Sequence, residues 1–215
     1  MEEDVKRLED NRREMQRRRE FPNWEKLYVE QAVETMPWFH PELDSDLEDA
    51  LGRLSIDSGS FLDLGTGPGT QAIALAERGF RVTGTDISET AVRKAEALAA
   101  EKGLDLVFMA DDILSTGLKK KFDRVFDRGC FHVLDPDKRT EYARIVAELL
   151  EPGGYLFLKT FSIDEKMEGG PYRFTPDDIR AVFSKRFEVV SIEKSVFRGT
   201  LAEFPKALFS ILRKK

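Results

Sequence analysis

The sequence has few of the residues that build disulfides and zinc sites. It contains one cysteine, Cys130, and two histidines in 215 residues. One cysteine excludes an intramolecular disulfide, and with two histidines it falls short of a Cys/His zinc site. There is neither an apolar run of about 18 residues nor an apolar N-terminal stretch, so we predict no membrane span and no signal peptide. We therefore expect a cytoplasmic protein without a metal.

An excess of positive charge is also missing. Lys and Arg number 34 against 40 Asp and Glu, a formal net charge of −6. The domain-wide basic surface of a nucleic-acid-binding protein is therefore absent, and we expect no nucleic-acid partner. Charged residues reach 34%, with only two Asn and three Gln. This composition is a tendency of heat-adapted proteins, and a mesophilic protein with a strongly solvated surface is the alternative.

What remains is a chain of ordinary single-domain size with 41% apolar and 10% aromatic residues. We divide it into three segments: a charged extension (1–20), a helical cover segment (21–58) and a core (59–215). Residues 2–20 hold seven acids and seven bases, which is typical of a solvated helix. The arginine run at 17–19 either contacts a polyanion or belongs to that solvated face.

Predicted strands and helices alternate from residue 59 onward. The predicted strands are 61–64, 81–86, 106–110, 124–127, 155–160, 187–193 and 206–212. The predicted helices are 70–78, 89–101, 137–150 and 176–183, preceded by one capped by Asn23 and one opened by Pro41. The alternation predicts an α/β, doubly wound, largely parallel sheet. The link between the last two strands is too short for a parallel crossover, so we expect an antiparallel hairpin there.

The most informative segment is the glycine loop, residues 63–69, with the sequence Asp-Leu-Gly-Thr-Gly-Pro-Gly. Glycine lets the backbone turn sharply and approach a ligand closely. The G-x-G-x-G spacing differs from the G-x-G-x-x-G of dinucleotide-binding loops, and Pro68 removes a backbone donor. An NAD-dependent oxidoreductase is therefore the weaker alternative. Asp63 would repel a phosphate but suits a ligand with an ammonium group.

Acidic residues follow the next two predicted strands. Asp86 ends the second strand, where a carboxylate accepts hydrogen bonds from both hydroxyls of a ribose. Its alternative role, a helix N-cap, is better served by Ser88. After the third strand, Asp112 is our first choice and Asp111 our second to accept the exocyclic amine of adenine, with Ile113 packed on the ring.

Residues 61–163, with the glycine loop as the cofactor loop, resemble a class I S-adenosylmethionine-dependent methyltransferase. The resemblance implies a Rossmann-like sheet of seven strands with the last one antiparallel and helices on both faces. It also implies S-adenosyl-L-methionine as the cofactor and S-adenosyl-L-homocysteine as the product. The cofactor-binding residues would be Asp63, Gly65, Thr66, Gly67, Gly69, Asp86, Ile87, Asp111, Asp112, Ile113 and Asp127.

A narrower resemblance begins with Asp127-Arg128-Gly129 and continues through 135–142 and 170–179. These segments, with 24–28 and 37–38, are similar to the thiopurine S-methyltransferase-like small-molecule group. The resemblance implies a small-molecule acceptor, preferably a thiol or another chalcogen, and an N-terminal lid over the cofactor. The alternatives are a small-molecule O- or N-methyltransferase and a catalytically silent adenosyl-binding module.

Three residues at or just after the end of the fourth strand are candidates for catalysis. A thiol reacts as its thiolate, and an adjacent cation such as Arg128 lowers a thiol pKa. Asp127 either acts as a general base or orients Arg128, and the two could instead form a structural ion pair. His132 is either a base or a packed histidine. We interpret Cys130 as a small core residue.

Aromatic residues from two segments are candidates to contact the acceptor. Trp38 and Phe39 lie between prolines in the cover segment. The loop 162–174 carries Tyr172 and Arg173, and loops at this edge of such sheets form binding sites. Arg173 suits an anionic acceptor or is a solvated loop residue. The predicted acceptor contacts are Trp38, Phe39, Arg128, Phe131, Tyr172 and Arg173. We expect a monomer or weak homodimer with no membrane partner.

Overall fold

A computed structural model describes residues 19–215. The predicted charged extension therefore lies almost wholly outside the described residues. The strands are β1 (Ser60–Leu64), β2 (Arg81–Asp86), β3 (Val107–Ala110), β4 (Phe122–Arg128), β5 (Leu150–Ser162), β6 (Arg173–Phe174), β7 (Phe187–Val196) and β8 (Lys206–Lys214). The α-helices are α2 (Trp24–Glu30), α3 (Ser45–Arg53), α4 (Thr70–Glu77), α5 (Glu89–Glu101), α6 (Arg139–Leu149) and α7 (Pro176–Phe183).

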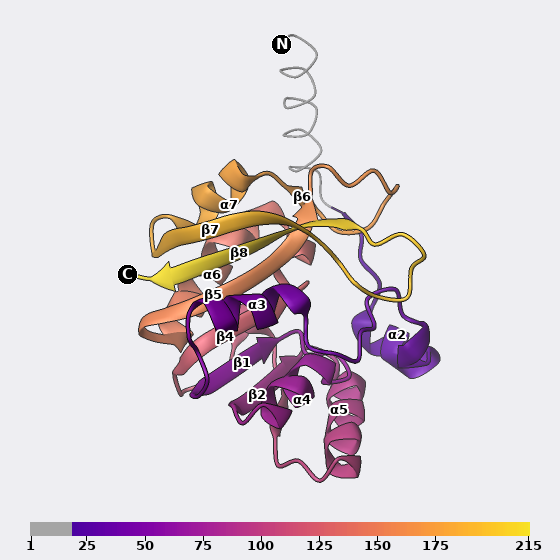
Figure 1. Ribbon diagram of the computed structural model, residues 1–215. Coiled ribbons are helices and arrows are strands. Elements are labelled where there is room, and N and C mark those ends of the chain that lie inside the picture. The colour runs from indigo at the N-terminus through magenta and orange to yellow at the C-terminus, as the bar shows by residue number, and fades with distance from the viewer. Residues whose placement is uncertain (1–18) are drawn as a thin grey trace.

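The strands form one twisted sheet in the order β3-β2-β1-β4-β5-β8-β7 (Figure 1). Strands β1 to β5 run parallel, and β8 lies antiparallel between β5 and β7. This confirms the predicted α/β sheet, its antiparallel final strand and the hairpin. The two-residue β6, which pairs with β5, was not predicted because it is too short to show an alternating pattern.

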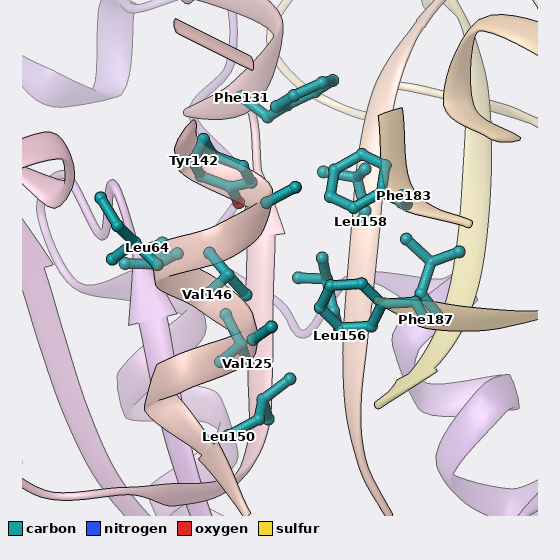
Figure 2. Packing of buried hydrophobic residues seen from close by; sticks show 14 of the residues in the cluster. Leu64, Val125, Phe131, Tyr142, Val146, Leu150, Leu156, Leu158, Phe183 and Phe187 are labelled. Atoms are coloured by element: carbon teal, nitrogen blue, oxygen red, sulfur yellow. The ribbon is translucent and has the colours of Figure 1, made fainter. Parts of the chain in front are cut away.

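Helices cover both faces of the sheet, as predicted (Figure 1). On one face, α6 and α7 pack against inward side chains of β4, β5 and β8, and Figure 2 shows this cluster around Tyr142, Val146 and Phe183. On the other face, α3, α4 and α5 enclose a second cluster that includes Phe61, Phe157 and Phe209. With both faces buried, the carboxyl ends of the parallel strands are the open edge where a ligand site can form.

Two predicted helix starts are wrong by a few residues. Pro41 does not open the second helix: α3 begins at Ser45, because the Asp44 carboxylate accepts a hydrogen bond from the Asp46 N–H (3.1 Å) and caps it there. Helix α6 begins at Arg139 because the preceding residues Pro136–Lys138 form a separate 3₁₀ turn. Asn23 caps α2 as predicted, accepting from the Lys26 N–H.

Residues 19–215 lack two features. No helix in this range is long and apolar enough to cross a bilayer. Within the same range, no group of three or more His, Cys, Asp or Glu side chains is placed to hold a metal ion.

Candidate active site

The glycine loop leaves β1 and enters α4 through three left-handed glycines, at 65, 67 and 69, with φ of 65°, 53° and 79°. Two of them are also required by close neighbours. A Cβ on Gly67 would lie 2.7 Å from the Tyr28 hydroxyl, and one on Gly69 would lie 2.7 Å from the Ala95 Cβ. Gly69 thus lets α4 pack on α5, and Gly67 lets α2 of the cover segment approach the loop.

The carboxylates of Asp63 in β1 and Asp86 in β2 contact this loop. Asp63 is buried and accepts a hydrogen bond from the Thr66 hydroxyl (2.6 Å), and burial raises its pKa to about 7. Asp86 accepts from the Gly67 N–H and the Ser88 N–H, both at 2.9 Å, one on each oxygen. Burial also raises the pKa of Asp86. Each Asp86 oxygen keeps a second lone pair for a ligand.

Ser88 is the N-cap of α5, as predicted, since its hydroxyl accepts from the Ala91 N–H at 3.0 Å. Next to it, the Ile87 side chain is 59% exposed. An exposed isoleucine beside the Asp86 carboxylate offers an apolar surface to a ligand bound at this end of β2.

The two acids after β3 have different environments. Asp112 caps the short turn that follows it by accepting from the Leu114 N–H (3.0 Å). Asp111 accepts from the Gly117 N–H (2.7 Å) with one oxygen, while its other oxygen is buried with no hydrogen-bond partner among the described residues. A buried carboxylate oxygen without a donor is costly unless a ligand supplies one. The geometry therefore favours Asp111, our second choice, over Asp112, with Ile113 buried beside them.

A cavity of about 50 Å³ lies above the glycine loop. Predicted cofactor and acceptor residues meet in it, namely Asp63, Gly65, Thr66 and Gly67 with Trp38, Phe39 and Arg128. The rest of its lining is Tyr28, Val33, Pro68, Thr70 and Gln71. The cavity therefore joins the cofactor loop, the cover segment and the end of β4.

The cover segment is tied to α5 beside this cavity. The Glu25 carboxylate accepts from the Ser88 hydroxyl (2.6 Å) and from the Thr90 N–H (3.0 Å). These side-chain and backbone hydrogen bonds lower the Glu25 pKa to about 2. One turn further, the Lys94 ammonium donates to the Tyr28 carbonyl (2.7 Å). Polar contacts thus hold α2 over the cofactor loop.

Asp127 is fully buried and has no free lone pair. Its two oxygens accept from the N–H groups of Gly129, Cys130 and Phe131 at 2.8–2.9 Å and from the Tyr142 hydroxyl. Burial raises its pKa to about 6 despite these donors. Four donors saturate a carboxylate. The placement supports a role in holding the turn after β4 rather than contact with a proton or cofactor.

Arg128 lies in the cavity wall, and its ion-pair partner differs from the expected one. Its Nε donates to Asp44 Oδ2 (3.0 Å), its Nη1 to the Trp38 carbonyl (3.0 Å) and its Nη2 to the Arg198 carbonyl. The alternative of an ion pair with Asp127 is therefore wrong, because Asp127 is saturated elsewhere. Asp44 lies 84 residues away in sequence and was not predicted as a site residue.

A second buried cation, Lys159 at the end of β5, was also not predicted. Its ammonium lies 2.7 Å from Asp44 Oδ2 and 2.6 Å from Asp46 Oδ2. The Ser195 hydroxyl of β7 donates to the same Asp46 carboxylate. No local sequence signal points to these contacts, because the partners come from three distant segments. The unusual feature visible in the sequence is a lysine directly after the apolar run 155–158 of a strand.

His132 is a packed, neutral histidine. It lies between the rings of Phe161 and Phe197, with centroids 5.2 and 5.3 Å away. Its Nδ1 accepts from the Phe161 N–H (3.3 Å). Burial, and then the charge of Arg128, lower its pKa to about 3. This position fits a packed histidine, which was the alternative to a catalytic base. His132 does not lie at the cavity and is not placed to act as a base there.

Phe131 and Cys130 also belong to the interior. The Phe131 ring contacts Tyr142, Phe174 and Phe183 with centroids 5.1–5.2 Å apart, inside the core shown in Figure 2. The structure therefore does not bring Phe131, a predicted acceptor contact, to the cavity lining. Burial raises the pKa of the Cys130 thiol well above its usual value, in keeping with a core residue.

Tyr172 and Arg173 hold the loop in front of β6. The Tyr172 hydroxyl accepts from the Arg19 N–H (2.9 Å) and donates to Asp135 (3.2 Å). Arg173 donates to the Gly169 carbonyl at 3.0 Å. Neither of these predicted acceptor contacts lines the cavity, so the structure assigns them to loop geometry.

With this geometry in view, comparison with known proteins identifies the family. A family model described as a methyltransferase domain matches residues 61–154. The chain is 31% identical over 174 residues to "Probable thiol methyltransferase 2" of Arabidopsis thaliana, covering 79% of this chain and 75% of that protein. The chain belongs to the class I S-adenosylmethionine-dependent methyltransferases. Within them it falls in the thiopurine S-methyltransferase-like small-molecule group.

Other similarities agree with this assignment. "Thiocyanate methyltransferase 1" of Arabidopsis thaliana is 29% identical over 80% of this chain and 76% of that protein. "Ubiquinone biosynthesis O-methyltransferase" of Caulobacter vibrioides is 36% identical over 53% of this chain and 45% of its own length. A solved structure described as "Conversion of a Disulfide Bond into a Thioacetal Group during Echinomycin Biosynthesis" has a TM-score of 0.77 and 26% identity, covering 89% of this chain and 92% of that one. This methyltransferase is thus an enzyme with a small-molecule acceptor.

S-adenosylmethionine is the cofactor of this family, and the chain's own residues fit it. The fit is seen in the orphaned Asp111 oxygen and in the buried Asp63 and Asp86 carboxylates beside the glycine loop, which can accept hydrogen bonds from an ammonium group and from hydroxyls. No basic side chain approaches Asp63 or Asp86 within salt-bridge distance among residues 19–215. These acids therefore have no cationic partner among the described residues and can accept one from a ligand.

Proposed function

We propose that this methyltransferase acts on a small thiol or another chalcogen nucleophile that binds as its anion. The observation that carries the proposal is the Arg128 guanidinium in the wall of the cavity, beside the glycine loop. It is supported by relatives named for thiols and thiocyanate.

The hydrogen bonds of Arg128 leave part of its donor capacity for an acceptor. A guanidinium carries five N–H donors, and the described partners Asp44, Trp38 and Arg198 take three. Its side chain is only 8% exposed, so the charge acts in surroundings of low polarity. A cation in such a place lowers the pKa of a neighbouring thiol and favours the reactive thiolate.

The cofactor residues follow from the same geometry. In this proposal Asp63 binds the ammonium group, Asp86 the ribose hydroxyls and Asp111 the adenine amine, with Ile87 and Ile113 against the ring. When bound, S-adenosylmethionine supplies an electrophilic methyl group that passes in line to the acceptor. The chain contributes alignment and exclusion of water, which are the main effects available to such a displacement.

For the cofactor to enter, α2 of the cover segment must move. A cavity of about 50 Å³ is well below the roughly 300–1,000 Å³ of pockets that bind drug-sized ligands. A nucleoside-sized ligand needs several times that volume. We infer that α2 lifts from the loop, breaking the contacts of Glu25 with Ser88 and Thr90, and closes again over the cofactor.

An O-methyltransferase is the second candidate, favoured by relatives of that name. A hydroxyl acceptor has to lose its proton to a base. Among the described residues, the cavity lining contains no histidine or glutamate, and Asp63 faces the cofactor loop. A thiol needs no such base once Arg128 favours the thiolate, so the lining suits sulfur better than oxygen.

The test is release of S-adenosylhomocysteine from S-adenosylmethionine by the purified protein over matched thiols, phenols, amines and carboxylates. We expect turnover with thiols, hydrosulfide or thiocyanate, and rates that rise with the thiolate fraction. Turnover confined to phenols or amines would contradict the sulfur preference while leaving the methyltransferase assignment intact.

A further inference from the structure

We propose that Asp44 is a positioning residue for methyl transfer: it holds the Arg128 guanidinium in the orientation that presents its remaining N–H donors to the acceptor. The inference rests on the proposed function of Arg128 and extends it to a residue of the cover segment. It starts from a buried charge cluster that links the cover segment to the ends of β4 and β5.

The sheet register places two cations side by side. Arg128 of β4 is paired with Lys159 of β5, and partners in a parallel register carry their side chains on the same face. Both reach one atom, Asp44 Oδ2, with Nε at 3.0 Å and Nζ at 2.7 Å. Asp44 and Lys159 are 0% and 1% exposed. Two like charges this close and this buried require a shared carboxylate between them.

Asp44 is itself held by hydrogen bonds to α3 and to α4. Its Oδ1 accepts from the Asp46 N–H, which caps α3, and its backbone N–H donates to Gln71 Oε1 at 2.8 Å. Gln71 lies in the first turn of α4, directly after the glycine loop. Burial alone would raise the Asp44 pKa, but Lys159 and Arg128 together lower it, so the carboxylate stays charged. The position of this carboxylate is therefore tied to the cofactor loop.

The Nε bond decides where the guanidinium plane points. The two Nη bonds go to the carbonyls of Trp38 and Arg198, which are neutral acceptors on connecting segments. The Nε bond goes to a charged acceptor at the start of a helix, and charge-assisted hydrogen bonds are about twice as strong as neutral ones. Without the Nε hydrogen bond, the Arg128 guanidinium loses its strongest restraint. Its remaining N–H donors are then no longer aligned with the cavity.

Lys159 has a different part in the cluster. Its ammonium also contacts Asp46 (2.6 Å) and lies 5.6 Å from the centre of the Phe197 ring, and Lys159 is not itself among the residues that line the cavity. It neutralises the acids of the cover segment but does not orient Arg128 directly. Asp44 and Lys159 can therefore be separated by mutation.

The test variant is Asp44→Asn. Asparagine is as good an N-cap as aspartate and has the same size, but it places an NH₂ group where Oδ2 accepted from Arg128 and Lys159. We expect kcat/KM for the acceptor to fall by about tenfold or more, the effect of a lost charge-assisted hydrogen bond. The Kd of S-adenosylhomocysteine should stay unchanged. The control is Glu193→Gln, which breaks an exposed arginine–carboxylate pair with Arg53 (2.8 Å) and should change neither quantity.

A double variant, Asp44→Asn with Lys159→Met, separates positioning from stability. It removes both members of the buried pair, so thermal stability should recover relative to Asp44→Asn alone. Acceptor kcat/KM should remain low, because Arg128 still lacks its Nε partner. Recovery of activity in parallel with stability would overturn the inference and leave Asp44 a purely structural residue.

A measurement without turnover keeps the inference distinct from the proposed function. In the complex with S-adenosylhomocysteine, the Arg128 Nε–H should give a protected ¹⁵N signal in the wild type that is lost in Asp44→Asn and retained in Glu193→Gln. If the wild type fails to methylate thiols but this signal behaves as stated, the acceptor class is wrong and the positioning role stands. A protected Nε–H in Asp44→Asn would overturn the positioning role.

Discussion

At the carboxyl ends of the parallel strands, the charged side chains fall into two halves that have different kinds of partner. At the ends of β1, β2 and β3, carboxylates bind backbone N–H groups or a hydroxyl close in the chain, such as Asp111 to Gly117 and Asp63 to Thr66. At the ends of β4 and β5, cations are paired with a carboxylate 84 and 115 residues away. The first half presents acids without a cationic partner among the described residues, and the second half presents two cations that share a carboxylate from a distant segment.

This difference corresponds to two tasks. Acids that keep free lone pairs can bind the ammonium, hydroxyl and amine groups of a cofactor, and they do so without distant partners. A cation that serves an incoming anion has to be held by the fold in every state of the enzyme, which a long-range carboxylate does. We therefore expect mutations in the two halves to affect different constants.

The largest effect expected in the cofactor half comes from Asp86→Ala. This change removes the two hydrogen bonds to ribose that we propose and the contacts that hold Gly67 and Ser88. Cofactor binding should weaken by about 2–3 kcal/mol, the magnitude of a lost charge-assisted pair. Isothermal calorimetry with S-adenosylhomocysteine measures it, with Asp112→Asn as the control because Asp112 caps its own turn. An unchanged affinity in Asp86→Ala would remove the ribose assignment.

A smaller effect is expected from pH at Asp63, whose pKa burial raises to about 7. The carboxyl is neutral below this pH and charged above it, and only the charged form pairs with an ammonium group. Affinity for S-adenosylhomocysteine should therefore rise as pH increases toward 7, by at most about tenfold per unit, and level off above it. In Asp63→Asn the affinity should no longer depend on pH. A wild-type affinity that is independent of pH from 5 to 8 would contradict the role of Asp63 in binding the ammonium group.

The candidate residues of the cofactor half could be predicted from the sequence because the patterns that mark them are local. The glycine loop, Asp86 and the choice between Asp111 and Asp112 all lie within a few residues of a strand end, where the alternation of strands and helices places them. The order of Asp111 and Asp112 was not accessible, because it depends on which oxygen a neighbouring N–H occupies. The β7–β8 hairpin was accessible from the length of its link.

The residues of the acceptor half could be predicted from the sequence only in part. Arg128 was found from its motif, but Asp44 and Lys159 were not, since contacts across such distances leave no pattern in one sequence. Phe131, Tyr172 and Arg173 were expected at the acceptor because aromatic and cationic residues near strand ends suggest binding. Their side chains turn instead to the core or to their own loop, which only packing determines.

The most direct test of the division between the two halves is Arg128→Lys, which keeps the charge but loses the planar fork. Thiol kcat/KM and the Kd of S-adenosylhomocysteine should be measured on the same preparation, after its cooperative melting has been checked. We predict that kcat/KM falls by about 10- to 100-fold, as for a lost charge-assisted hydrogen bond, while the Kd is unchanged. Equal losses in both constants, or a wild-type kcat/KM in the variant, would contradict the account.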